Sequence, residues 1–162
     1  MNKKILIIAI ITLVIDQLTK IIIETFLGLN QSFTIIKNFF TFYYTNNYGA
    51  AWSLFNNQIP LLVIVSIIVL IIIIRYMNTF TTNLRNTIAF GIVLGGIAGN
   101  LIDRLFLGYV RDFIAFKFWD YQFPIFNISD MAIFLGISLL IIAIIKGEDY
   151  ETNHRKKSIK NR

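Results

Sequence analysis

The sequence has no cysteine and a single histidine, His154, among its 162 residues. The absence of cysteine excludes a disulfide scaffold, a thiol nucleophile and a cysteine-ligated metal. Because His154 lies in a polar C-terminal stretch, neither a histidine-based catalytic triad nor a zinc site is expected. Catalysis by this chain must therefore use Asp, Glu, Ser, Thr, Lys or Tyr side chains. Nothing in the sequence indicates a metal or an organic cofactor.

The abundant residues are apolar. Hydrophobic residues make up 56% of the chain and the mean hydropathy is +0.68, whereas a soluble domain is about 45–50% apolar. This excess predicts a membrane protein that is mainly α-helical. Four apolar runs predict transmembrane helices over residues 4–26, 59–75, 86–104 and 129–146. The chain is expected to form one integral membrane domain, 1–162, with a basic tail at 147–162.

The segment between the first two apolar runs is aromatic and β-branched. Residues 33–44 contain six aromatic side chains, a composition that predicts short strands or a hairpin rather than a helix. Aromatic rings of this kind suit the bilayer interface. Gly49, Ala50 and Ala51 follow with almost no side-chain bulk, so a peptide or another helix can approach this backbone closely.

The basic residues predict the orientation in the membrane. The start of the chain, the 75–85 loop and the tail from residue 146 hold 10 of the 15 Lys and Arg residues. Four spans return both termini to one side, which the positive-inside rule makes cytoplasmic. Residues 27–58 and 105–130 then face the extracytoplasmic side. The basic tail lies near anionic lipid and does not indicate binding of nucleic acid.

A dense polar set between residues 99 and 130 is the main functional candidate. Its carboxylates Asp112 and Asp130 each lie at the edge of an apolar segment, and two carboxylates that share one proton can activate water. Taken alone, Asp130 is more often an N-cap of the following helix, and Asp112 is a loop carboxylate. The pair favours an intramembrane aspartic hydrolase.

Two other polar features lie on the predicted helices. Asp16 and Lys20 are four residues apart and share a helix face, either as a structural ion pair or with a role toward the substrate. Gly91, Gly95, Gly99 and Asp103 follow one another at four-residue steps, which predicts a smooth ridge for close helix packing. The neighbouring Arg104 is expected to pair with Asp103 or to hold substrate carbonyls.

Several sequence blocks resemble those of a known family. They are Asp16-Gln17-x-Thr19-Lys20, Asn47-Tyr48-Gly49-Ala50-Ala51-Trp52, Gly99-Asn100-Leu101-Ile102-Asp103-Arg104, Val110-Arg111-Asp112-Phe113 and Phe126-Asn127-Ile128-Ser129-Asp130. In this order they resemble the lipoprotein signal peptidase (signal peptidase II) family over nearly the whole chain. The resemblance implies an aspartic endopeptidase of the bacterial cell membrane. Such an enzyme removes the signal peptide from prolipoproteins, just before the diacylglyceryl-modified cysteine.

The resemblance also implies roles for individual residues. Asp112 and Asp130 are implied to be the catalytic dyad, near the extracytoplasmic face. Support and substrate binding are implied for Asp16, Lys20, Asn47, Gly49, Ala50, Ala51, Asn100, Asp103, Arg104 and Asn127. The aromatic segment 33–44 resembles the small extracytoplasmic β-sheet of the family. Ser129 departs from the usual Ala, and its hydroxyl is expected to bond the dyad or a neighbouring carbonyl. The expected partners are prolipoproteins and membrane lipids, and the protein is expected to be a monomer.

Two other classes of function remain open on the residues alone. A small transporter also carries intramembrane carboxylates, along a path open to both faces. Only Asp16 and Lys20 are expected toward the cytoplasm, whereas the other candidates cluster toward the opposite face. A non-catalytic assembly factor leaves the paired aspartate blocks unexplained.

Overall fold

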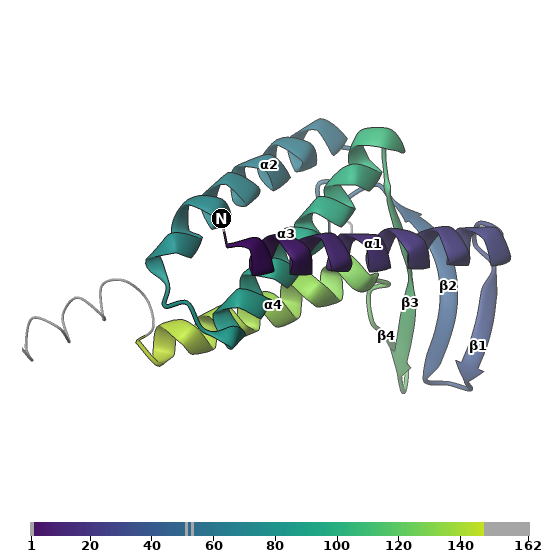
Figure 1. Ribbon diagram of the computed structural model, residues 1–162. Helices are drawn as coiled ribbons and strands as arrows, with labels where there is room; N and C mark the ends of the chain where they lie inside the picture. The colour runs from purple at the N-terminus through teal and green to yellow at the C-terminus, as the bar shows by residue number, and fades with distance from the viewer. Residues whose placement is uncertain (1, 51, 53, 148–162) are drawn as a thin grey trace, which may run out of the picture.

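Four long helices and one small sheet make up the computed structural model, which describes residues 2–50, 52 and 54–147 (Figure 1). The helices are α1 (Lys3–Phe26), α2 (Ile59–Tyr76), α3 (Leu84–Phe106) and α4 (Ile128–Ile145). A short 3-10 turn, η2 (Met77–Thr79), follows α2. All four helices are long and apolar enough to cross a membrane, so the expected four-span, mainly α-helical architecture is confirmed.

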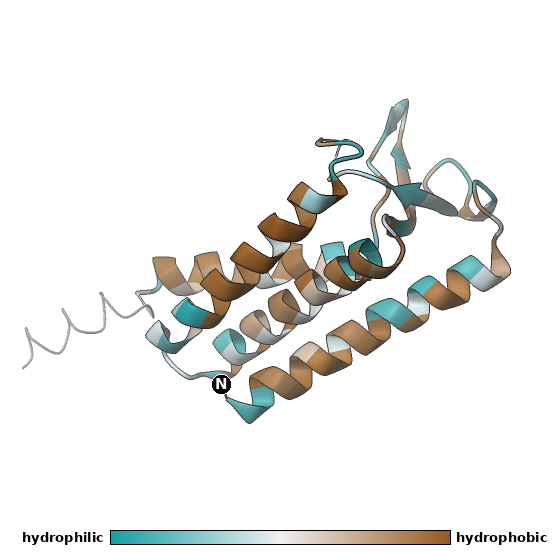
Figure 2. Ribbon diagram, turned by 90° about the horizontal axis from the view of Figure 1, so that it is seen from above, coloured by the Kyte–Doolittle hydropathy of each residue, from teal (hydrophilic) through white to brown (hydrophobic). Residues whose placement is uncertain are grey.

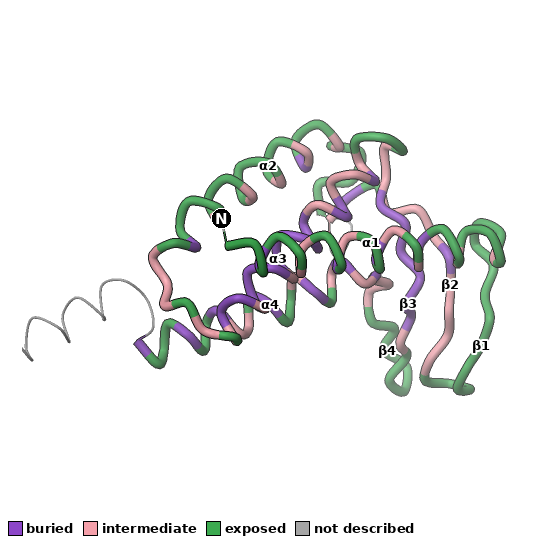
Figure 3. Tube along the Cα trace, in the orientation of Figure 1, coloured by how far each residue is buried: buried purple, intermediate pink, exposed green. Residues whose placement is uncertain are grey.

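Helix α3 is the centre of the bundle. It contacts α1, α2 and α4, and it is buried along most of its length, while α1 and α2 are largely exposed (Figure 3). Its apolar side chains form the core with residues of α1, η2 and α4. The members of this core are Ile5, Met77, Ala89, Phe90, Val93, Leu94, Ile97 and Leu140.

The glycines of α3 allow the close helix packing that their spacing predicts. A Cβ added at Gly95 would lie 2.5 Å from the carbonyl oxygen of Ala9 on α1. A Cβ added at Gly96 would lie 2.7 Å from the carbonyl oxygen of Ser129 on α4. Because these contacts involve backbone atoms, a side chain at either position would force the helices apart.

The outer faces of the helices are apolar. The ribbons of α1, α2 and α4 are mostly brown, the colour of hydrophobic residues, in Figure 2, and many of their Ile, Leu and Val side chains are exposed. Leu62 is the one residue of α2 that is buried. Soluble monomeric proteins rarely expose so many apolar side chains side by side to water. These side chains are suited to contact with lipid tails.

The sheet lies at the end of the bundle remote from the N-terminus (Figure 1). Its strands β1 (Ser32–Ile36), β2 (Phe40–Asn47), β3 (Val110–Phe118) and β4 (Tyr121–Gln122) pair antiparallel in that order. The aromatic segment therefore forms strands, as expected. Asp112 is not a loop carboxylate, because it lies on β3. The register pairs Thr45 with Asp112 and Asn47 with Val110, which carries Asn47 to the side of Asp112.

Candidate active site

Asp112 and Asp130 come from different elements and meet at Asn127. Asp112 projects from β3 and is 2% exposed, and Asp130 lies in the first turn of α4. The side-chain amide of Asn127 donates to Asp112 Oδ1 at 2.7 Å. The backbone N–H of the same residue donates to Asp130 Oδ2 at 3.1 Å. One residue thus holds both carboxyl groups beside each other.

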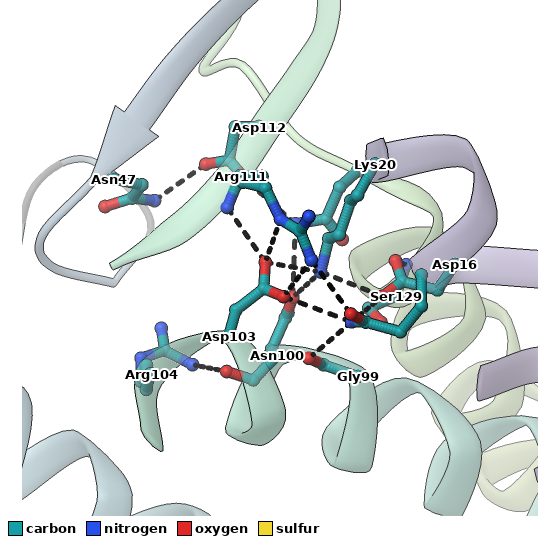
Figure 4. Close-up of polar contacts among 12 residues, drawn as sticks. Asp16, Lys20, Asn47, Gly99, Asn100, Asp103, Arg104, Arg111, Asp112 and Ser129 are labelled. Carbon is teal, nitrogen blue, oxygen red and sulfur yellow. Dashed lines mark hydrogen bonds and ion pairs between the residues drawn. The ribbon is translucent and has the colours of Figure 1, made fainter. Parts of the chain in front are cut away.

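Each of the four carboxyl oxygens of the pair accepts an N–H group. Asn47 Nδ2 donates to Asp112 Oδ2 at 2.8 Å (Figure 4), and Asn100 Nδ2 donates to Asp130 Oδ1 at 2.7 Å. The two bonds from Asn127 serve the other two oxygens. This complete set of donors fixes the rotation of both carboxyl groups, which is what a pair that acts together on one water requires.

The first turn of α4 corrects the N-cap interpretation of Asp130. The N-cap is Asn127, whose Oδ1 accepts from the backbone N–H of Asp130 at 3.0 Å. Asp130 stands three residues later and bonds back to the backbone of Asn127, so the two form a capping box. The positive end of the α4 dipole therefore lies at the Asp130 carboxyl group.

Burial changes the acidity of Asp112. Loss of solvent raises the pKa of its carboxyl group to about 7, and the negative charge on Asp130 contributes in the same direction. The hydrogen bonds from Asn47 and Asn127 act against this rise. With one carboxyl group protonated near neutral pH, the pair can both accept and donate a proton.

An ion cluster lies beside the pair and contains Asp16, Lys20, Asp103, Arg111 and Glu24. Lys20 Nζ lies 2.8 Å from Asp16 Oδ2 and 3.2 Å from Asp103 Oδ2 (Figure 4). Both carboxyl side chains and the Lys20 side chain are fully buried. The expectation that Asp16 and Lys20 stand apart from the other polar candidates is therefore wrong. They join Asp103 in one cluster because α1 and α3 pack along the glycine ridge.

Two further residues are functional candidates: Arg111, which belongs to the polar set of residues 99–130 but had no predicted role, and Glu24, which was not predicted. Arg111 Nη2 lies 2.8 Å from Asp103 Oδ1, and Arg111 Nη1 lies 3.0 Å from Glu24 Oε2. The spacing of Asp16, Lys20 and Glu24, at steps of four, was a signal for Glu24, since it places all three on one face of α1. Arg111 immediately precedes Asp112 in its block, and only the fold shows that it faces Asp103.

Arg104 does not pair with Asp103, which corrects one of the two expected roles. Adjacent helical residues point in directions about 100° apart, so Asp103 faces Lys20 and Arg111 while Arg104 faces the other way. Arg104 Nη2 donates to the Gly49 carbonyl oxygen at 3.0 Å. It thus holds the loop that follows β2.

The small-residue loop lies against the pair. The backbone N–H of Gly49 donates to Asn47 Oδ1 at 2.9 Å, and the N–H of Ala50 donates to the carbonyl oxygen of Leu54 at 2.8 Å. Ala51 and the tail from residue 148, with His154, lie outside the described residues. In the described part of the chain no group of three His, Cys, Asp or Glu residues is placed to hold a metal ion.

Ser129 connects α4 to the ion cluster through its backbone. Its N–H donates to Asp16 Oδ1 at 2.8 Å. Its hydroxyl group is buried and has no hydrogen-bond partner among the residues that are described. The expected hydrogen bond from this hydroxyl to the dyad or to a carbonyl is therefore absent there.

A family model and individual relatives place this chain in the same family. A family model described as signal peptidase (SPase) II matches residues 8–146. A lipoprotein signal peptidase of Staphylococcus haemolyticus is 37% identical over 142 residues, which cover 87% of this chain and 90% of the relative. One of Staphylococcus aureus is 35% identical over 156 residues, covering 96% and 94%.

Two solved structures of similar sequence have the same fold as this chain. Two structures of a bacterial membrane enzyme, determined by the in meso method at 2.3 Å and 1.9 Å resolution, superpose with TM-scores of 0.79 and 0.80. Both are 35% identical in sequence and cover 90% of this chain, and the matched parts are 90% and 95% of those chains.

Proposed function

Because the chain belongs to the signal peptidase II family, we infer that it is a membrane-embedded aspartic peptidase that removes signal peptides from prolipoproteins. The observation that carries the chemistry is the pair of the buried Asp112 and the half-buried Asp130, with an N–H donor on every carboxyl oxygen. We propose that these two residues are the catalytic dyad. The residues that surround them orient the pair or hold the substrate.

The pair supports a water-activating mechanism. One ionised carboxylate takes a proton from water as the water oxygen attacks the scissile carbonyl carbon. The protonated partner donates to the carbonyl oxygen as charge develops there. The first carboxyl group then passes its proton to the leaving amine, the C–N bond breaks, and one hydroxyl proton of the diol intermediate returns to the partner.

The buried charges balance when the pair holds one proton. Asp16 and Asp103, together with one charge on the dyad, offset the cations Lys20, Arg104 and Arg111. Glu24 also pairs with Arg111, but 40% of its side chain is exposed, so water solvates its charge and it is not counted among the buried groups. A second charge on the dyad would be uncompensated in a buried site, which is costly. The arrangement therefore favours the singly protonated dyad that the mechanism needs.

The acidic residues disfavour a transporter. In the described part of the chain every Asp or Glu residue belongs to the dyad, to the ion cluster or, as Asp120, to the β3–β4 turn. A proton or cation path needs acceptors accessible from both faces. No acidic group among the described residues lies at the N-terminal end of the bundle.

We propose that the sheet end of the bundle faces the extracytoplasmic side. The N-terminus, the α2–α3 turn and the C-terminal end of α4 gather at the other end (Figure 1), where Lys3, Lys4, Arg75 and Arg85 lie. The positive-inside rule makes that end cytoplasmic. A reporter inserted between Thr79 and Asn83 should read out as cytoplasmic. An extracytoplasmic signal there would overturn the orientation.

The position of the site suits a lipidated substrate. A diacylglyceryl group is held in the bilayer by about 0.8 kcal/mol per buried CH₂, so cleavage beside it must occur where the membrane ends. Gly49 and Ala50, between Asn47 and Arg104, offer a backbone that an extended peptide can approach. Membrane lipids are expected around the helices, and a monomer suffices because one chain supplies every residue of the proposed site.

Cleavage of matched precursors tests the proposed function. Purified protein is incubated with a diacylglyceryl-modified precursor and with the same precursor lacking the modification. Cleavage of the modified form alone, at the bond before the modified cysteine, supports the proposal. Asp120→Asn is the matched control for the dyad variants, because Asp120 is an exposed aspartate in the turn after β3. Absence of cleavage by the well-folded protein would contradict the proposal.

A further inference from the structure

Lys20 is fully buried, and no step of the proposed reaction uses its ammonium group. Its ammonium group lies 2.8 Å from Asp16 Oδ2, 3.2 Å from Asp103 Oδ2 and 2.9 Å from Asn100 Oδ1. A lysine ammonium has three N–H donors and no acceptor, so these three contacts use its whole capacity. The third contact leads out of the ion cluster and toward the dyad.

Lys20 determines which way the Asn100 amide points. Because the ammonium group can only donate, the carbonyl oxygen of Asn100 must face it, and the amide nitrogen must face the other side. On that side Asn100 Nδ2 donates to Asp130 Oδ1 at 2.7 Å. The Asn100 oxygen also accepts from Asn127 Nδ2 at 3.2 Å, which fills its second lone pair. The contacts Lys20–Asn100–Asp130 thus form one hydrogen-bonded chain.

The two carboxyl groups of the dyad differ in the groups that contact their hydrogen-bond donors. The donors to Asp112 are the amides of Asn47 and Asn127, whose own oxygens accept from the backbone N–H groups of Gly49 and Asp130. These are neutral groups. The donors to Asp130 are an amide polarised by the Lys20 cation and a backbone N–H at the start of α4, where the helix dipole is positive.

Charged groups from three elements face Asp130. They are Asp16 and Lys20 on α1, Arg104 on α3, and Asp112 on β3. The charge of Arg104 acts on both members of the dyad, so it does not separate them. The charge of Lys20 also acts on both carboxyl groups. Of the two, however, only Asp130 accepts a hydrogen bond directly from Asn100, the amide that Lys20 holds.

We propose that Lys20 is a positioning residue that acts through Asn100 to keep the negative charge of the dyad on Asp130. This inference rests on the proposed function and assigns the two roles within it. Asp130 takes the proton from water, and the proton held by Asp112 moves to the carbonyl oxygen of the substrate. Collapse of the resulting diol breaks the C–N bond. The proton on Asp130 goes to the leaving nitrogen, and one diol hydroxyl proton returns to Asp112. The raised pKa of Asp112 agrees with this division.

The acid limb of the single-turnover rate tests the role of Lys20. Lys20→Met removes the cation but keeps the length of the side chain, and the acid limb should move to higher pH by about one unit or more. Asp16→Asn is the matched control, since it breaks the same ion pair while leaving the Lys20–Asn100 contact in place. Its acid limb should not move to higher pH. Lys37→Met removes a lysine charge at an exposed position and should keep the wild-type profile.

Coupling between the two positions tests the route through Asn100. If Lys20 acts through Asn100, the double variant Lys20→Met/Asn100→Ala should shift the acid limb no further than Asn100→Ala alone. Additive shifts, or an unmoved acid limb in Lys20→Met, would overturn the proposal. If Lys20→Met does not fold, the single variant Asn100→Ala tests the proposal. An acid limb of Asn100→Ala at the same pH as that of the wild type would overturn it.

A measurement without turnover separates this inference from the proposed function. Asp112→Asn and Asp130→Asn each leave one carboxyl group of the dyad, whose carboxylic-acid C=O stretch is followed by infrared difference spectroscopy. Near neutral pH the acid band should be present in Asp130→Asn and absent in Asp112→Asn. The reverse pattern would overturn the proposal, whether or not the protein cleaves the precursor.

Discussion

The burial of Asp112 predicts how stability changes with pH. Burial and the negative charge of Asp130 raise the pKa of Asp112 to about 7, against about 3.9 in an unfolded chain. Below about pH 4 the carboxyl group is protonated in both states, and its burial carries no ionisation cost. Between about pH 4 and about pH 7 the unfolded state releases the proton and the folded state keeps it. Stability should therefore fall as pH rises through this window.

The pKa difference sets the size of the effect. About three pH units at about 1.4 kcal/mol per unit lower the free energy of unfolding by about 4 kcal/mol across the window. Asp112→Asn removes this titration. It also replaces one acceptor oxygen by an amide nitrogen that faces Asn47 or Asn127, at a pH-independent cost of about 1–3 kcal/mol. The wild type should be more stable at acid pH and the variant more stable at alkaline pH.

Unfolding in mild detergent, followed by tryptophan fluorescence, measures this crossover. The quantity of interest is the wild-type free energy of unfolding minus that of Asp112→Asn, as a function of pH. Asp120→Asn, which removes an exposed carboxyl group, should follow the wild type closely. A difference between wild type and Asp112→Asn that stays constant from acid to alkaline pH would refute the account of Asp112.

Three other measurements test separate parts of the structure. The cleavage rate should be a bell-shaped function of pH, with an alkaline limb near the pKa of about 7 of Asp112, because the pair works only with one proton. A rate that rises with pH and shows no alkaline limb argues against a protonated donor. Gly95→Ala should lower the free energy of unfolding by about 1–3 kcal/mol, since its Cβ would lie 2.5 Å from the carbonyl oxygen of Ala9. Gly28→Ala is the control and should lower it far less, because its Cβ would lie 3.3 Å from Gln31 Cγ, a side-chain atom. Melting temperatures of the two variants compare the effects. Equal effects of the two glycine substitutions would contradict the close packing of α1 on α3. Ser129→Ala should leave the stability unchanged or raise it by about 1 kcal/mol, because it removes a buried hydroxyl without a partner among the described residues; a clear loss of stability would reveal a hydrogen bond.

Hydropathy was sufficient to predict the helices but not the path of the chain between them. The four apolar runs predicted α1 to α4 because a lipid environment requires long, continuous apolar segments. The strands of the aromatic segment were also predicted. Strand β3 was not, because the pairing of Asp112 with Thr45 depends on residues far away in the sequence. Its alternation is also masked, since residues 110–115 of the strand are all buried.

The polar residues of the site could be chosen from the sequence, but their partners could not. The blocks around Asp112 and Asp130 identified the pair, and the i, i+4 spacing identified the ion pair of Asp16 with Lys20. The rotation of α1 about its axis decides that Lys20 also faces Asp103, and no local pattern specifies that rotation. Arg104 was misplaced because adjacency in the sequence does not make neighbours on a helix.

Cleavage of a lipidated precursor by the dyad variants tests the central claim most directly. Asn is nearly isosteric with Asp but cannot take the proton from water, so Asp112→Asn and Asp130→Asn should each lower the single-turnover rate by about 10³-fold or more. Because the two residues act as a unit, the double variant should be little worse than either single variant. Melting temperatures recorded in parallel show that the variants are folded. Substantial turnover by either folded single variant would contradict the assignment of Asp112 and Asp130 as the catalytic pair.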